Sequence, residues 1–253
     1  MGQTLAMGAH ALSSNSSVFS ALVSAPVAKS LRAFFTMLFP ETCPGCGQLD
    51  TRLCDRCRGV FLRPPTSVNA AMSVDVNQVW TLSLYQGQAR RVVLAMKHSR
   101  SYYYQQLPFF FGAVAGKALA SYLSRALLVC PAPSTFRIGK TPISSTAGKL
   151  AAGIAAGLIS QGLDVRLSGL LQLKPGTKKQ AGRSFQERLR GRAGSMQLGT
   201  AKDLDFSGEV LLVDDVITTG ATIREAVRVI NEAQAQVKAV FSLSIAERNL
   251  KRG

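Results

Sequence analysis

The sequence lacks a long uninterrupted apolar run. The two best candidates, 18–39 and 107–123, are broken by proline or charged residues, so no segment is predicted to cross a membrane. Residues 1–26 are rich in Ser and Ala but have no basic stretch ahead of a strong apolar one, which argues against a signal peptide. We therefore expect a cytoplasmic protein with a flexible N-terminal extension, for which Met7 and Met37 are alternative starts.

Histidine and acidic residues are also scarce. The chain has 2 His, and its 14 Asp and Glu stand against 30 Lys and Arg, which gives a formal net charge of +16 at pH 7. Such an excess predicts an anionic partner: a polyphosphate substrate, nucleic acid or both. A solvated basic face is the alternative interpretation of the densest basic run. That run contains Lys174, Lys178, Lys179, Arg183, Arg188, Arg190 and Arg192.

Cysteine is rare, but four of the five cysteines form two Cys-x-x-Cys pairs, Cys43 with Cys46 and Cys54 with Cys57. Two such pairs with a short spacer are typical of a zinc knuckle, in which four thiolates hold one ion. Disulfides and a redox pair are alternatives, but a reduced cytosol disfavours disulfides and a redox site needs only one pair. We expect a structural zinc ion, because four protein ligands leave no open position. The fifth cysteine, Cys130, should be a buried core residue.

Strand and helix patterns alternate along the rest of the chain. Strands are predicted at 79–85, 127–130, 165–173, 210–213 and 237–245, and helices at 28–39, 88–98, 109–123, 146–160 and 223–233. This alternation predicts an α/β fold with a doubly wound, mostly parallel sheet and ligands at the carboxyl ends of its strands. We expect three regions: a flexible extension with a short helix at 1–36, a zinc module at 37–63 and the α/β domain at 78–253.

The most informative segment of the chain is 210–222. Its four apolar residues, 210–213, predict a buried strand of a parallel sheet. Asp214 and Asp215 lie where that strand should end. The loop that follows offers hydroxyl groups and one glycine, in the order Thr218, Thr219, Gly220, Ala221 and Thr222.

A helix should begin at the end of this loop. Thr222 and Glu225 have the spacing of a capping box, which predicts a helix start at Ile223. The N–H groups and the dipole at such a start bind anions, whereas adjacent carboxylates would repel a phosphate. The segment therefore predicts a sugar phosphate, with its phosphate in the loop and its hydroxyls, with a divalent cation, on the acids. An Asp-Asp turn without a ligand, at the end of a doubly wound sheet, is the structural alternative.

This pattern resembles the 5-phosphoribosyl-1-diphosphate (PRPP) signature of type I phosphoribosyltransferases. The resemblance implies a phosphoribosyltransferase-like fold in which Asp214 and Asp215 contact the ribose 2′ and 3′ hydroxyls. It also implies that the hydroxyl loop wraps the 5-phosphate. The implied PRPP-binding residues are Val213, Asp214, Asp215, Thr218, Thr219, Gly220, Ala221, Thr222, Arg137 and Arg183.

The order of the motifs, with a four-cysteine knuckle first and the PRPP signature last, resembles the ComF family of bacterial phosphoribosyltransferase-like proteins. That family is associated with DNA uptake in competence. Smaller segments agree with the resemblance, which covers most of 37–247. These segments are Phe39-Pro40-x-x-Cys43, Tyr85 with Lys97, Pro131-Ala132-Pro133, and Thr177-Lys178-Lys179-Gln180 followed by Glu187-Arg188.

The chain departs from the family pattern at the diphosphate and acceptor ends. Where the family has Arg-x-x-x-Arg-Gly-Phe-Asn-Gln, this sequence keeps the charge only at Arg137 and Lys140. Gly191 occupies the neighbourhood of an expected asparagine, and the segment after Lys97 lacks an expected glycine. A protein that binds PRPP with weak or no transferase activity is therefore an open alternative.

The resemblance implies displacement of pyrophosphate from C1 of PRPP by a nitrogen nucleophile of unknown identity. Mg²⁺ bound with PRPP would bridge pyrophosphate and ribose oxygens. The implied catalytic residues are Asp214 and Asp215, with Lys178 and Lys179 on a loop that closes over the leaving group. His98 could be an acid–base residue, but we expect a partly exposed residue at a helix end instead. The alternative function is an accessory protein that senses PRPP or a nucleotide. It would use its zinc knuckle and basic charge to bind single-stranded DNA or the competence machinery.

Overall fold

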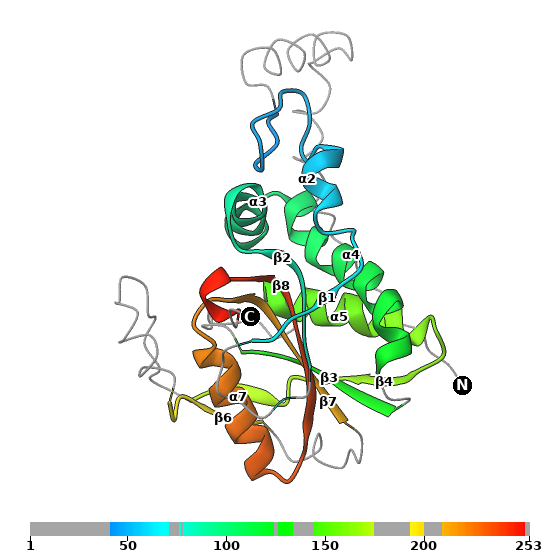
Figure 1. Ribbon diagram of the computed structural model, residues 1–253, viewed down its shortest axis with the longest axis vertical. Helices are drawn as coiled ribbons and strands as arrows, with labels where there is room; N and C mark the ends of the chain where they lie inside the picture. Colours follow the sequence, from blue (N-terminus) through cyan, green and yellow to red (C-terminus); the bar gives the residue numbers. More distant parts are fainter. Residues whose placement is uncertain are drawn as a thin grey trace, which may run out of the picture.

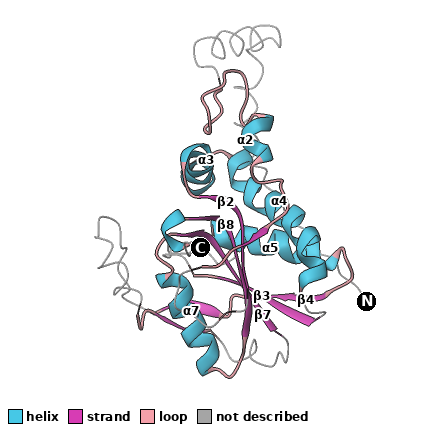
Figure 2. Ribbon diagram, in the orientation of Figure 1, coloured by secondary structure: helices cyan, strands magenta, loops and turns pink. Residues whose placement is uncertain are grey.

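The computed structural model describes residues 41–70, 76, 78–123, 126–133, 144–174, 193–199 and 209–250. These residues build a six-stranded sheet with helices on both faces (Figures 1 and 2). Every neighbouring pair of strands is parallel except the pair at one edge, where the short β1 runs antiparallel to β2. In spatial order the strands are β1 (Thr66–Ser67), β2 (Gln78–Leu84), β8 (Val237–Ile245), β7 (Glu209–Ile217), β3 (Ala126–Pro131) and β4 (Asp164–Leu167).

The two faces of the sheet are covered by different elements. One face packs on helices α3 (Gly87–His98), α4 (Tyr102–Leu119) and α5 (Thr146–Ile159). The other face packs on helix α7 (Ala221–Glu232) and on a separate antiparallel pair of strands, β5 (Leu171–Leu173) and β6 (Met196–Leu198) (Figure 1). Shorter helical turns are α2 (Asp55–Gly59), η1 (Ala120–Tyr122) and η4 (Glu247–Asn249).

Strand β7 shows why the sheet is buried on both sides. Successive side chains of a strand point to opposite faces. Leu211 and Val213 accordingly belong to the hydrophobic cluster under α3, α4 and α5, whereas Val210 and Leu212 belong to the cluster under α7. An unbroken apolar run is what a central parallel strand requires.

Helices α4 and α5 pack through glycines so closely that their backbones touch. A Cβ added at Gly153 would lie 2.0 Å from the carbonyl oxygen of Phe109, and one at Gly116 would lie 2.4 Å from that of Ile154. A Cβ added at Gly112 or at Gly157 would likewise meet a backbone oxygen of the opposite helix. Since Gly weakens a helix by about 1 kcal/mol relative to Ala, close contact of the two helices must offset four such residues.

The expected α/β alternation is confirmed, with a mostly parallel sheet and a four-cysteine cluster ahead of it. The strand 237–245 matches β8 residue for residue, and the helices expected at 88–98, 146–160 and 223–233 match α3, α5 and α7 within two residues at each end. The helix expected at 28–39 lies outside the described residues.

The single strand predicted at 165–173 is wrong. The structure has two strands there, because β4 pairs with β3 only as far as Leu167, and β5 pairs with β6 in a separate sheet. Between them, Gly169 interrupts the apolar run, a position at which strands commonly bend. Leu170 and Leu171 are then buried in the cluster on the α7 face.

Helix α4 begins at Tyr102, earlier than the predicted start at 109, and therefore contains Pro108 in its interior. Proline in a helix removes one backbone hydrogen bond and costs roughly 3 kcal/mol. Here Leu107, Pro108 and Phe111 are all buried. The packing of this turn outweighs the local preference that placed the predicted boundary after the proline.

Candidate functional site

The paired acids lie at the point where strand β7 loses its neighbour β3. The β3–β7 ladder ends at Pro131 opposite Val213, and the N–H of Ala132 donates to the Val213 carbonyl at 2.7 Å. On its other side β7 stays paired with β8 as far as Ile217. The sequence predicted that this strand ends at the two acids. It instead continues past them to Ile217, paired with β8 only. This one-sided extension puts Asp214 and Asp215 at the carboxyl edge of the sheet, where open α/β sheets bind ligands.

The two carboxylates differ in their surroundings. Asp214 is 9% exposed, and its Oδ1 accepts the backbone N–H of Asp215 at 2.8 Å. Asp215 forms an ion pair with Lys97 of α3, with Nζ and Oδ1 2.8 Å apart. Burial lowers the pKa of the Lys97 ammonium, but the charge and hydrogen bond of Asp215, together with the charges of Asp214 and Tyr85, raise it by more, so the pKa lies above its ordinary value. The positive charge of Lys97 therefore lies directly beside the acid pair.

The loop between β7 and α7 is held by its carbonyl groups. The Thr218 carbonyl accepts Arg248 Nε at 2.9 Å and Asn249 Nδ2 at 2.8 Å, and the Thr219 carbonyl accepts Arg224 Nη1 at 3.2 Å. The backbone N–H groups of 218–220 donate to no backbone carbonyl among the residues that the structure describes. With its carbonyls held in this way, the loop leaves these N–H groups available to an anion.

Helix α7 begins two residues earlier than predicted. Gly220 is the residue before its first turn and has φ +69°, a left-handed conformation that glycine adopts without strain. The N–H of Ala221 donates to Thr219 Oγ1 at 3.3 Å. The hydroxyl loop therefore leads directly into the N-terminus of a helix, as an anion site requires.

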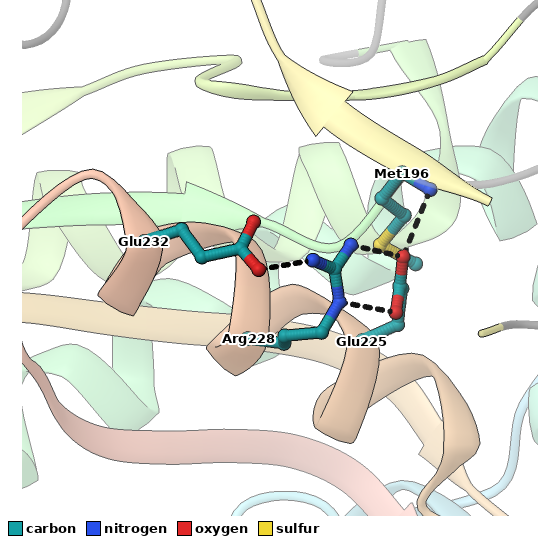
Figure 3. A network of polar contacts seen from close by, with 4 residues as sticks. All are labelled: Met196, Glu225, Arg228 and Glu232. Carbon is teal, nitrogen blue, oxygen red and sulfur yellow. Dashed lines mark hydrogen bonds and ion pairs between the residues drawn. The ribbon is translucent and has the colours of Figure 1, made fainter. Parts of the chain in front are cut away.

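The predicted capping box is wrong, because Glu225 does not reach back to Thr222. The Glu225 side chain is 3% exposed and accepts the backbone N–H of Met196, at the start of β6, at 3.2 Å (Figure 3). Arg228 binds both of its oxygens, and Glu232 binds the same arginine (Figure 3). Burial raises the pKa of Glu225, but its hydrogen bonds with Arg228, Met196 and Gly194 lower the pKa by more, to below the ordinary 4.5.

The four predicted metal ligands lie together. The Sγ atoms of Cys43, Cys46, Cys54 and Cys57 are all within 4.8 Å of one another, and those of Cys46 and Cys54 are 3.6 Å apart. Sulfurs about 2.3 Å from a tetrahedral zinc ion are roughly 3.8 Å apart, so the cluster has suitable dimensions. None of the chain's five cysteines forms a disulfide, and Cys130 is buried as expected. The cluster could hold a metal ion such as zinc.

Backbone groups around the cluster favour a thiolate at Cys43. Burial raises the pKa of Cys43, but hydrogen bonds from the backbones of Cys54, Cys46 and Gly45 lower it by more, to about 6. Burial and the other thiols raise the pKa of Cys57. These opposite shifts mean that the close sulfurs cannot all ionise without a cation. A divalent metal ion supplies that charge.

The cysteine cluster is docked on the helices of the α/β domain. The Gly45 carbonyl accepts Nε of Arg91, on α3, at 2.8 Å and also Nη2 of the same residue. A Cβ at Gly45 would lie 2.5 Å from Cys57 Sγ and 3.0 Å from a methyl carbon of Val92. Phe61 stacks on Phe111 of α4 with ring centroids 5.0 Å apart. The cluster and α3 therefore share one packed interface.

Several predicted site residues lie outside the described residues: Arg137, Lys140, Lys178, Lys179 and Arg183. Among the described residues, the candidate diphosphate end therefore has Pro131, the last residue of β3, and Ala132 and Pro133, which follow that strand. His98 lies at the end of α3, as expected, and is exposed.

Sequence reasoning missed four residues around the site. Lys97 was noted only as part of a family segment, and nothing in its spacing pairs it with Asp215. Arg224, Arg248 and Asn249 act on backbone carbonyls of the loop, and such contacts leave no motif in a sequence. The only available signal was position, because η4 follows the neighbouring strand β8 and must end at the same edge of the sheet.

A scan against protein-family models and a search of curated proteins both find no match. Among the described residues, no helix is long and apolar enough to cross a membrane.

Proposed function

We propose that the chain is a PRPP-binding, phosphoribosyltransferase-like protein similar to the ComF family, with zinc in its cysteine cluster and Mg²⁺ bound together with PRPP. The observation that carries the proposal is the geometry of 213–222. Two carboxylates at the open edge of β7 are followed by a loop whose carbonyls are held by Arg224, Arg248 and Asn249, and then by a helix N-terminus.

Each part of this segment matches one part of the ligand. The N–H groups of 218–220, the hydroxyl groups of the loop and the α7 dipole would bind the 5-phosphate. Asp214 and Asp215 would accept hydrogen bonds from the ribose hydroxyls. An ionised phosphate could not donate such hydrogen bonds. Lys97 would stay beside Asp215, where its charge limits repulsion between the two carboxylates.

The proposed reaction breaks the bond between C1 of the ribose and pyrophosphate and forms a bond between C1 and a nitrogen of the acceptor. Pyrophosphate leaves with the bonding electron pair, and the acceptor nitrogen loses a proton. Mg²⁺ would neutralise charge on the leaving group. The protein's share is to fix the ribose and its phosphate, so that C1 is held in place for the acceptor.

Calorimetric titration of PRPP with Mg²⁺ into the full chain tests the proposal. We expect saturable binding to the wild type and a loss of at least tenfold in affinity for Asp214→Asn and for Asp215→Asn, about 1.4 kcal/mol each. Asp164→Asn, at an exposed position at the start of β4, is the matched control and should bind normally.

A thermal-unfolding experiment gives a second readout. PRPP at about one hundred times its dissociation constant should stabilise the fold by about 2.7 kcal/mol. No heat of binding and no stabilisation would contradict the proposal. Binding of PRPP without release of pyrophosphate when nitrogenous bases are added as acceptors would support the non-catalytic alternative.

A further inference from the structure

Helix α3 is attached at one end to the sheet edge that carries the acids. Lys97, in its last turn, reaches Asp215 on β7, and the Lys97 side chain is 28% exposed. Met96, the residue before it, is buried in the core. The position of α3 on the sheet therefore places the Lys97 side chain within ion-pair distance of Asp215.

The same helix is attached to the cysteine cluster through residues one to two turns earlier. Arg91 donates two hydrogen bonds to the Gly45 carbonyl, and the Val92 side chain is buried against the cluster. Arg91 and Lys97 are six residues apart, which is about 9 Å along a helix. A helix of this length transmits a shift from one residue to the other as a rigid rod.

We propose that the metal-bound cysteine cluster acts as a brace that sets helix α3, and thereby holds Lys97 on Asp215. Metal release from the cluster then loosens the acid pair. Cys43, Cys54 and Cys57 are buried in the same hydrophobic cluster as Val92 and Phe61. Small cysteine modules fold and bind metal in one equilibrium, so loss of the ion uncovers the outer face of α3.

Through this link, metal release would weaken PRPP binding at the acid pair, a consequence that rests on the proposed function. The mechanical link itself can be measured without a ligand. Lys97 is the reporter, because an amine in an ion pair reacts slowly with acylating reagents. Lys117 on α4 is exposed and serves as the internal reference.

The experiment compares metal-loaded protein with protein whose metal has been removed by a chelator under reducing conditions. Both samples are acylated briefly, and the extent of acylation at each lysine is measured by mass spectrometry. We expect Lys97 to react roughly tenfold faster after metal removal, because an amine that leaves its carboxylate partner loses its proton more readily. Lys117 should be unchanged. Amide exchange of β7 and β8 is measured in parallel to establish that the sheet is still folded.

A variant tests the same link with the metal in place. Arg91→Met removes the hydrogen bonds to Gly45 and leaves all four thiols, so Lys97 should again react faster. Arg56→Met removes an equal charge from the exposed side of α2 and should have no effect. Equal Lys97 reactivity in the wild type and Arg91→Met, both metal-loaded, would overturn the brace, whatever the stripped protein does.

The PRPP titration separates this inference from the proposed function. If metal release and Arg91→Met both make Lys97 react faster but PRPP does not bind to the loaded protein, the brace stands and the proposed function fails. If PRPP binds to both metal-loaded and stripped protein with equal affinity, while Lys97 reactivity is unchanged, the brace fails and the proposed function stands.

Discussion

Glu225→Gln replaces one oxygen by an NH₂ group and should nevertheless destabilise the fold. Both carboxylate oxygens face donors only: Oε1 accepts from the Met196 N–H and from Arg228 Nη2, and Oε2 accepts from Arg228 Nε. An amide must turn its NH₂ group toward one of these donors. We expect a loss of about 1–3 kcal/mol in the free energy of unfolding, the usual result when a buried group loses its hydrogen-bond partner.

The pKa of Glu225 sets the pH range in which the difference is present. Because folding lowers this pKa from its ordinary 4.5, the carboxylate stabilises the fold above that value and loses its effect as the pH falls through the folded pKa. The glutamine cannot titrate. The gap between the two proteins should therefore be complete at neutral pH and should shrink as the pH falls below 4.5.

Urea unfolding followed by fluorescence measures the gap, since the only tryptophan, Trp80, is buried in β2. Glu232→Gln is the matched control, because Glu232 binds the same Arg228 but is 63% exposed. It should change stability by no more than about 0.5 kcal/mol. Equal stability of Glu225→Gln and wild type at neutral pH, or a gap that does not vary with pH, would refute this reasoning.

Three further predictions concern packing, metal and the loop. Gly153→Ala should destabilise by about 3 kcal/mol in urea unfolding, because its methyl group meets a backbone oxygen, whereas Gly59→Ala meets nothing and should be near neutral. Cys57→Ser should abolish retention of a metal ion in elemental analysis after gel filtration, and Cys130→Ser should not. Asn249→Ala should raise the PRPP dissociation constant about tenfold in calorimetry by loosening the loop; unchanged affinity would argue against the loop's role.

The central strands were predictable because their sequence pattern has a single structural solution. The unbroken apolar run of β7 and the strand β8 can be buried only between two layers, and the alternation with helices fixes a parallel sheet. The cysteine cluster was predictable for a similar reason, since the spacing of its two pairs brings four sulfurs together.

The errors occurred where tertiary contacts outweigh local pattern. The start of α4 was missed because packing tolerates Pro108 inside a helix. The capping box failed because Glu225 finds stronger donors in Arg228 and in β6, which is distant in sequence. The Lys97–Asp215 pair joins residues that no local rule connects.

Amide hydrogen exchange of the full chain with and without saturating PRPP and Mg²⁺ tests the central claim most directly. If the 5-phosphate is held by the loop at the start of α7, the amides of 218–222 should exchange at least tenfold more slowly with the ligand, while those of the cysteine cluster stay unchanged. Unchanged exchange in 218–222 at a PRPP concentration that gives a binding heat would contradict it, because the ligand would then lie elsewhere.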